Sequence, residues 1–142
     1  MLLTQDKSIC EKRQKVVVSK DDKQSRVHRA INPEQKYDLR HYRLDGDLIK
    51  YEKCCDFLLL NDSLQKAYFI ELKGENIDEA VEQLEAAALK LRSELKDYLC
   101  LYRIVSSRVP THKVHSMKYR KFQEKCGARL ITKSKRLEEI LN

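Results

Sequence analysis

The sequence predicts one α/β domain in which helices flank a mixed central β-sheet. Three features indicate this fold: a strand–turn–strand pattern over residues 57–72, an amphipathic helix after it, and a further apolar strand over residues 98–107. A helix that connects two neighbouring strands forms a right-handed crossover and makes them parallel. At 142 residues, the chain suits a single domain that buries about two-thirds of its unfolded surface.

Residues 1–35 form a basic N-terminal region with few structural signals. Val16-Val17-Val18 indicates a short strand. Asn32-Pro33-Glu34 favours the start of a leading helix, because asparagine caps helices and proline suits the first helical position. Residues 39–51 predict a hairpin around Asp45-Gly46, a dipeptide typical of tight hairpin turns. Asp45 is then a turn residue or, alternatively, a third carboxylate beside the adjoining strand pair.

The register of the next hairpin follows from its turn. Opposite residues of an antiparallel pair have a constant index sum, and a turn centred between Ser63 and Leu64 makes that sum 127. Asp56 then lies opposite Glu71. Side chains alternate along a strand, so Lys73 shares the face of Glu71. Two carboxylates and one ammonium group therefore converge at one end of the hairpin.

Facing carboxylates at this spacing repel each other unless a cation neutralises them. A divalent cation would do so, and a neighbouring lysine would orient or help to deprotonate a water. The alternative is an exposed ion-pair cluster on the hairpin surface. Against it, the run 57–60 has no polar alternation, which is typical of a strand covered on both faces. Charges at the end of such a strand indicate a site.

Asp56 followed by Glu71-Leu72-Lys73 resembles the PD-(D/E)xK signature of the restriction-endonuclease-like nuclease superfamily. The resemblance covers about residues 40–107, and Cys55 stands at the proline position without changing a ligand. It implies an αβββαβ core and metal-dependent hydrolysis of phosphodiester bonds. By position, Asp56, Glu71 and the carbonyl of Leu72 would bind Mg²⁺ or Mn²⁺, with Asp45 as a further candidate ligand. Lys73 would orient the attacking water.

The helix after the hairpin is the best supported one. Asn76 is its expected cap, Asp78 and Glu79 suit the first turn, and apolar residues recur along one stripe to Leu95. Gln83 lies one position off that stripe. Some exonuclease-like branches of the superfamily carry a glutamine here and a tyrosine four residues later, where this chain has alanine. Gln83 is thus a candidate catalytic residue or a plain surface glutamine.

Beyond the strand over residues 98–107, three shorter elements are expected. Residues 115–125 predict a basic helix with Tyr119 and Phe122 on its apolar side, and Gly127 suits its C-terminal end. Residues 128–133 predict a last strand. Residues 136–141 predict a terminal helical turn.

Charge is divided unevenly along the chain. Residues 44–102 hold 7 Lys and Arg against 13 Asp and Glu, whereas residues 103–136 hold 11 against Glu124 alone. An acidic site needs metal and a phosphate substrate needs cationic walls, so this division favours nucleic acid as partner. DNA is the expected partner over RNA, but the charge pattern does not distinguish the two. A solvated basic surface is the alternative. The expected phosphate contacts are Arg108, Lys113, Lys118, Lys121 and Lys125.

Other features narrow the class of protein. The sequence has no run of about 18 apolar residues, which favours a cytoplasmic protein without a membrane partner. Its five cysteines lack a Cys-x-x-Cys pair and are expected to be reduced thiols. Its four histidines lack metal-ligand spacing and are expected on the surface or in loops.

Three functions agree with these features. The favoured one is a small Mg²⁺-dependent nuclease, which would act as a homodimer if it cuts both strands. The second is a module on the same fold that binds nucleic acid or a protein partner without turnover. The third is a protein whose acidic helix over residues 76–97 docks a basic partner. Substrate structure and the choice of endonuclease or exonuclease are not determined by the sequence.

Overall fold

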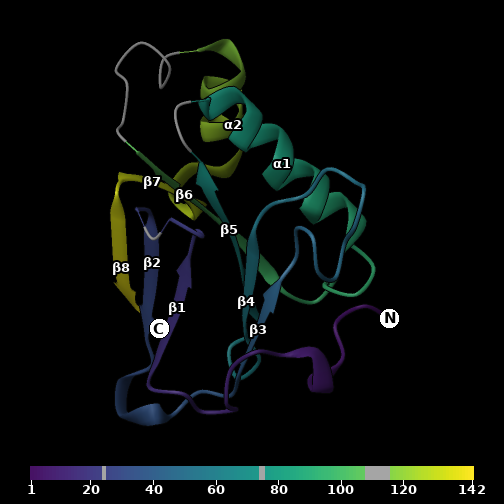
Figure 1. Ribbon diagram of the computed structural model, residues 1–142, viewed down its shortest axis with the longest axis vertical. Helices are drawn as coiled ribbons and strands as arrows, with labels where there is room; N and C mark the ends of the chain where they lie inside the picture. Colours follow the sequence, from purple (N-terminus) through teal and green to yellow (C-terminus); the bar gives the residue numbers. More distant parts are fainter. Residues whose placement is uncertain (24, 74–75, 108–115) are drawn as a thin grey trace.

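The computed structural model describes all residues except 24, 74–75 and 108–115. Of Lys73 it describes the backbone but not the side chain. The described part is a mixed α/β fold with two helices and two mixed sheets (Figure 1). Within it, no helix has the length and apolar character needed to cross a membrane. The strands are β1 Val16–Lys20, β2 Val27–Ile31, β3 Leu39–Arg43, β4 Phe57–Asn61, β5 Lys66–Lys73, β6 Leu99–Ser106, β7 Leu130–Ser134 and β8 Arg136–Ile140, and the helices are α1 Ile77–Lys90 and α2 Met117–Cys126.

The larger sheet has the strand order β3-β4-β5-β6-β7. Its first three strands form an antiparallel meander, and β6 and β7 add in parallel. Phe57 pairs with Ile70, which gives the index sum of 127 and confirms the predicted register. The helix α1 connects β5 to β6, so the predicted parallel crossover is also confirmed.

Both expected helices are present, although α1 ends before the end of its predicted stripe. The side chain of Asn76 accepts a hydrogen bond from the Glu79 amide at 3.0 Å, which confirms the predicted cap of α1. This helix ends at Lys90, although the apolar stripe continues through a turn to the buried Leu95. The basic helix α2 ends at Gly127, whose φ of +57° favours glycine.

The strand β4 is buried on both faces, as its unbroken apolar run predicts. On one face, Leu58 and Leu60 join the core beneath α1 and α2. On the other, Phe57 and Leu59 join a second core that includes Leu137 of β8. The larger sheet therefore lies between the helices and the three-stranded sheet β1-β2-β8, an arrangement visible in Figure 1.

The expectation of a helical turn at residues 136–141 is wrong. These residues form β8, which pairs in parallel with β2. The alternation of buried and exposed side chains explains why this segment is a strand. Leu137 and Leu141 are buried between the sheets, while Glu138 is exposed. Pairing with the edge of β2 thus overrides the helix preference of leucine and glutamate. The predicted strands at residues 16–18 and 128–133 are confirmed as β1 and β7.

The expected helical start at Asn32-Pro33-Glu34 is a single 3-10 turn, Pro33–Gln35. The expected cap is wrong, because the Asn32 side chain binds backbone groups of Gln14 and Tyr37 instead of a helix amide. The hairpin over residues 39–51 is absent from the described structure. Its first strand, β3, pairs with β4 instead.

Candidate functional site

The start of β4 and the end of β5 lie at the same end of the larger sheet (Figure 1). Asp56 and Glu71 meet there. The Asp56 amide donates to Glu71 Oε1 at 3.1 Å, and the Leu72 amide donates to Asp56 Oδ2 at 2.9 Å. Each acidic residue is therefore fixed by the opposite strand. The side-by-side placement of these residues, inferred from the hairpin register, is confirmed.

The carboxylate of Glu71 lies inside the protein. Glu71 is only 2% exposed, and Asp56 is partly buried. Two buried cysteines precede Asp56, and burial is the main reason that their pKa values are high, with the nearby carboxylates adding to it. The pKa of Cys54 rises to about 12 and that of Cys55 lies well above its ordinary value. Both thiols are therefore neutral at pH 7, and all five cysteines are free, as expected.

Gln83 extends from α1 to the same carboxylate. With its amide oriented so that nitrogen faces the acceptors, it donates to Glu71 Oε2 at 2.7 Å and to the Glu79 carbonyl at 3.2 Å. This contact places Gln83 beside a candidate metal ligand rather than on a plain helix surface. A glutamine here fixes one carboxylate oxygen without adding charge.

A small pocket opens on the other side of Asp56. Its volume is about 190 Å³. Phe57 and Leu72 line it together with four aspartates and two cations: Asp21, Asp22, Asp45, Asp56, Lys20 and Arg43. Asp45 is exposed and precedes Gly46, whose φ of +79° marks the turn. Asp45 is thus both a turn residue and a carboxylate on the pocket that Asp56 lines.

Several predicted site residues are not described in full. The backbone of Lys73 ends β5 opposite Ser106, but its side chain lies outside the described part, as do Arg108 and Lys113. Lys118, Lys121 and Lys125 are exposed and follow one side of α2. Lys118 forms an ion pair with Glu82 at 3.1 Å, which brings it within one residue of Gln83 along α1.

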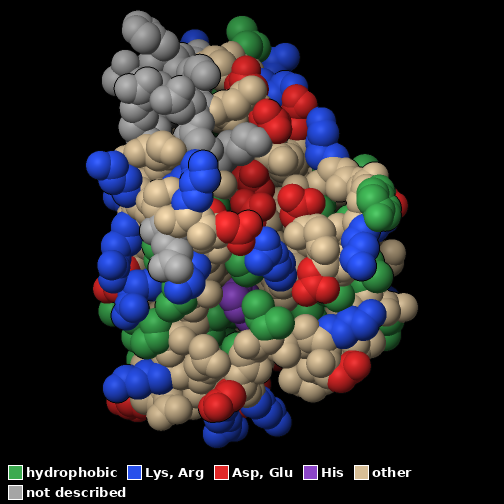
Figure 2. Space-filling model, viewed as in Figure 1, with side chains coloured by type: hydrophobic (Ala, Val, Ile, Leu, Met, Phe, Trp, Pro, Cys, Tyr) green, Lys and Arg blue, Asp and Glu red, His purple; other side chains and the backbone are tan. Residues whose placement is uncertain are grey.

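The face in Figure 2 shows the resulting pattern of charge. Acidic side chains gather where β5 leads toward α1, and Lys and Arg side chains lie around them. Arg43 and Lys20 were not predicted as part of the site. Arg43 was missed because the sequence did not predict the β3–β4 register. In that register Arg43 lies opposite Phe57 and therefore next to Asp56.

The expectation that histidines lie on the surface or in loops is wrong for two of them, and His112 and His115 lie outside the described residues. His28 is fully buried and its Nε2 lies 2.7 Å from Glu139 Oε2. His41 is buried beside Ser19, 2.9 Å from its hydroxyl, and burial followed by the charge of His28 lowers the pKa of His41 to about 4. Strands β2 and β3 carry these histidines into the layer between the sheets.

The carboxylates of Asp56 and Glu71 suit a hard divalent cation that binds few protein ligands. Among the described residues, no group of three or more His, Cys, Asp or Glu side chains is arranged to hold a metal ion. Mg²⁺, however, usually keeps several waters and takes only one or two protein carboxylates. Asp56 and Glu71 supply two, and the carbonyl of Leu72 is the proposed third oxygen. The donor set therefore fits Mg²⁺ or Mn²⁺ better than a metal that needs a full protein cage.

Comparison with known protein families, with curated proteins and with solved structures gave no significant match. The functional assignment therefore depends on the residues and on their arrangement.

Proposed function

We propose that this protein is a metal-dependent nuclease of the PD-(D/E)xK type that hydrolyses phosphodiester bonds of DNA or, alternatively, RNA. The observation that carries the proposal is the mutual fixing of Asp56 and Glu71 through the Asp56 amide and the Leu72 amide. Gln83 supports it by binding the second oxygen of Glu71. The order β3-β4-β5-α1-β6 agrees with the later part of the proposed αβββαβ core.

In this function, Asp56 and Glu71 would hold the cation together with the carbonyl of Leu72. A bound Mg²⁺ would supply Lewis acidity toward phosphoryl oxygen and would lower the pKa of a water. Lys73, two residues beyond Glu71 on the same strand, would orient that water. Gln83 would hold Glu71 in place, which preserves the orientation of its carboxylate.

The substrate would be held by cationic side chains around the acidic site. Lys118, Lys121 and Lys125 form a line along α2 that begins near Gln83. Such a line would contact successive phosphates of a strand, while Arg108 and Lys113 are further proposed contacts. If both strands of a duplex are cut, two copies of the chain would act together.

The deciding experiment is a cleavage assay. Purified protein is incubated with labelled single-stranded, duplex and branched DNA and RNA in the presence of Mg²⁺, Mn²⁺ or EDTA. The proposal requires a product that forms with metal and is lost in EDTA. Absence of product on every substrate would reject the nuclease.

A binding module on the same fold is the second candidate. It is favoured by the exposed lysines Lys118, Lys121 and Lys125 on one side of α2, which could bind an acidic partner without a metal. It predicts metal-independent binding of nucleic acid or of a protein, without product. A gel-shift assay in EDTA, run beside the cleavage assay, separates the two functions.

A further inference from the structure

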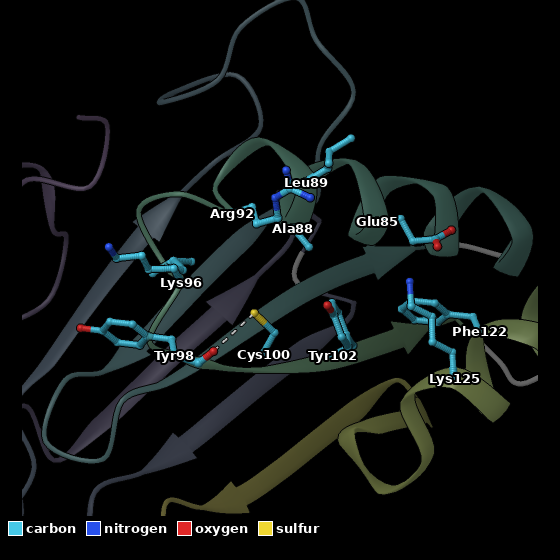
Figure 3. A pocket seen from close by; sticks show the side chains of 11 residues that line it. Glu85, Ala88, Leu89, Arg92, Lys96, Tyr98, Cys100, Tyr102, Phe122 and Lys125 are labelled. Carbon is cyan, nitrogen blue, oxygen red and sulfur yellow. Dashed lines mark hydrogen bonds between the residues drawn. The ribbon is translucent and has the colours of Figure 1, made fainter.

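A groove lies away from the candidate metal site, between α1 and α2. Figure 3 shows its walls, with Glu85, Ala88 and Leu89 on α1, Cys100 and Tyr102 on β6, and further residues on α2. Its volume is about 500 Å³, within the range of specific binding sites. The candidate metal site lies near the first turns of α1, whereas the groove follows its second half, so the groove is separate from the metal site. Lys125 belongs both to the groove and to the proposed phosphate contacts.

The floor of the groove is apolar. Ala88, Leu95, Tyr102 and Phe122 line it, and all but Ala88 belong to the buried core. Leu89 is 67% exposed at its edge. Most of the apolar surface that a partner could cover therefore belongs to Leu89 and to the partly buried Ala88. Covering it would gain about 25 cal/mol per Å² of apolar surface removed from water.

The rim of the groove is cationic. Arg92, Lys96 and Lys125 line it against one carboxylate, Glu85. Within the described part of the chain, none of these three cations forms an ion pair, whereas Lys90 and Lys118 nearby do. The groove therefore offers three positive charges that the fold itself does not neutralise.

From this combination we infer that the groove is a docking site for an acidic amphipathic helix of a partner protein. Leucine-like side chains on one face of such a helix would enter the floor, and flanking glutamates or aspartates would meet Arg92, Lys96 and Lys125. A nucleic acid would satisfy the cations but not the floor. A helix that packs on Leu89 and Ala88 removes this apolar surface from water, whereas a phosphate backbone leaves it exposed.

A synthetic helical peptide provides the test. The probe carries leucines at positions i, i+4 and i+7, glutamates on both flanks and one tryptophan. The protein has no tryptophan, so the fluorescence anisotropy of the peptide reports binding directly. We expect saturable binding, at least a tenfold loss of affinity in Arg92→Glu/Lys96→Glu, and little loss in the matched control Lys7→Glu/Lys15→Glu. A lysine-flanked version of the peptide should not bind.

Cysteine protection places the peptide on the protein. Cys100 lines the groove and Cys10 lies elsewhere, and both are partly buried thiols whose pKa is raised mainly by burial. The peptide should slow alkylation of Cys100 at least fivefold, measured by mass spectrometry, while leaving the rate at Cys10 unchanged.

Two results would overturn the inference. One is a lack of saturable binding up to millimolar peptide by a protein that melts cooperatively. The other is protection of Cys100 by an oligonucleotide and not by the peptide, which would make the groove part of a nucleic-acid surface. Neither result bears on metal-dependent cleavage, so the inference and the proposed nuclease fail separately.

Discussion

The backbone amide of Asp56 donates to the side chain of Glu71 at 3.1 Å, one residue before β4 begins. This bond extends the pairing of β4 and β5 beyond the ladder itself. A slip of one residue in that pairing would move every side chain of β4 to the opposite face. The contact between the two acidic residues is therefore as well defined as the buried register that produces it.

Substitution of the three proposed catalytic side chains should lower cleavage strongly without unfolding the protein. Asp56→Asn, Glu71→Gln and Lys73→Ala should each lower kcat/KM at least about 10²-fold, because each removes metal charge or water activation rather than core volume. Circular dichroism should be unchanged. Asp47→Asn, an exposed carboxylate in the turn after β3, is the control. Near-normal activity of Asp56→Asn would end the assignment.

Metal binding should also be visible in thermal melting. The parent should gain about 1.4 kcal/mol, or about 3–5 °C, when Mg²⁺ exceeds its Kd tenfold, and Asp56→Asn should gain much less. In EDTA, Asp56→Asn should melt higher than the parent, because the amide oxygen still accepts from Leu72 while the repulsion from Glu71 is gone. A lower melting temperature, with no gain from metal in the parent, would make Asp56 a structural residue.

Phosphate contacts along α2 should give nucleic-acid binding a steep salt dependence. Neutralising Lys118, Lys121 and Lys125 together should flatten the slope of log K against log salt by up to about 0.9 per lost contact on duplex DNA. The measurement is a salt titration of the equilibrium constant. An unchanged slope would place the strand elsewhere, and Lys12, Arg13 and Lys15 would be examined next.

Arg43 should contribute a phosphate contact beside Asp56. Its guanidinium lies 3.5 Å from Asp22, and the two side chains are 50% and 85% exposed, so this ion pair is weak and easily exchanged. Arg43→Gln should weaken binding severalfold. Asp22→Asn should strengthen nucleic-acid binding by more than Asp97→Asn does. Asp97→Asn is the control because it removes the same charge just before β6 begins, at the end of the sheet opposite the site. Equal effects of the two aspartate variants would exclude a role for Arg43.

The buried ion pair between the sheets should control acid stability. Burial alone would raise the pKa of Glu139, but hydrogen bonds from His28 and Arg103 outweigh burial and lower this pKa to about 2. Because the folded-state pKa is below the ordinary 4.5, the stabilisation is complete above that value and is lost as pH falls toward 2.

Glu139→Gln should therefore cost about 3 kcal/mol of unfolding free energy at pH 7, since it leaves Arg103 without its buried partner. The difference from the parent should shrink between pH 4.5 and 2, as urea titrations would show. Glu138→Gln is the control on the same strand, with its exposed pairs to Arg29 and Arg136. An equal loss in both variants would contradict the assigned role of Glu139.

Local patterns in the sequence predicted the part of the fold that carries the site. The turn at residues 61–63 fixed the β4–β5 register, and the cap and stripe fixed α1, because these signals involve neighbours in sequence. The pairing of β3 with β4 was missed because the Asp45-Gly46 dipeptide favoured a hairpin within residues 39–51, and Arg43 was missed with it. The strand at residues 136–140 was missed because it pairs with β2, which is distant in the sequence, and no local signal reports that pairing or the contact of His28 with Glu139.

The pairing of β2 with β8 joins residues that are far apart along the chain, as the 109-residue separation of Arg29 and Glu138 shows. We expect contacts of such long range to form late in folding, because a large loop must close before any contact is gained. The β3-β4-β5 meander needs only short connections, so the carboxylate pair would assemble first. Until β8 arrives, the edge of β2 stays open to pairing with other chains. Refolding yield should therefore fall steeply as protein concentration rises, even though the site itself forms early.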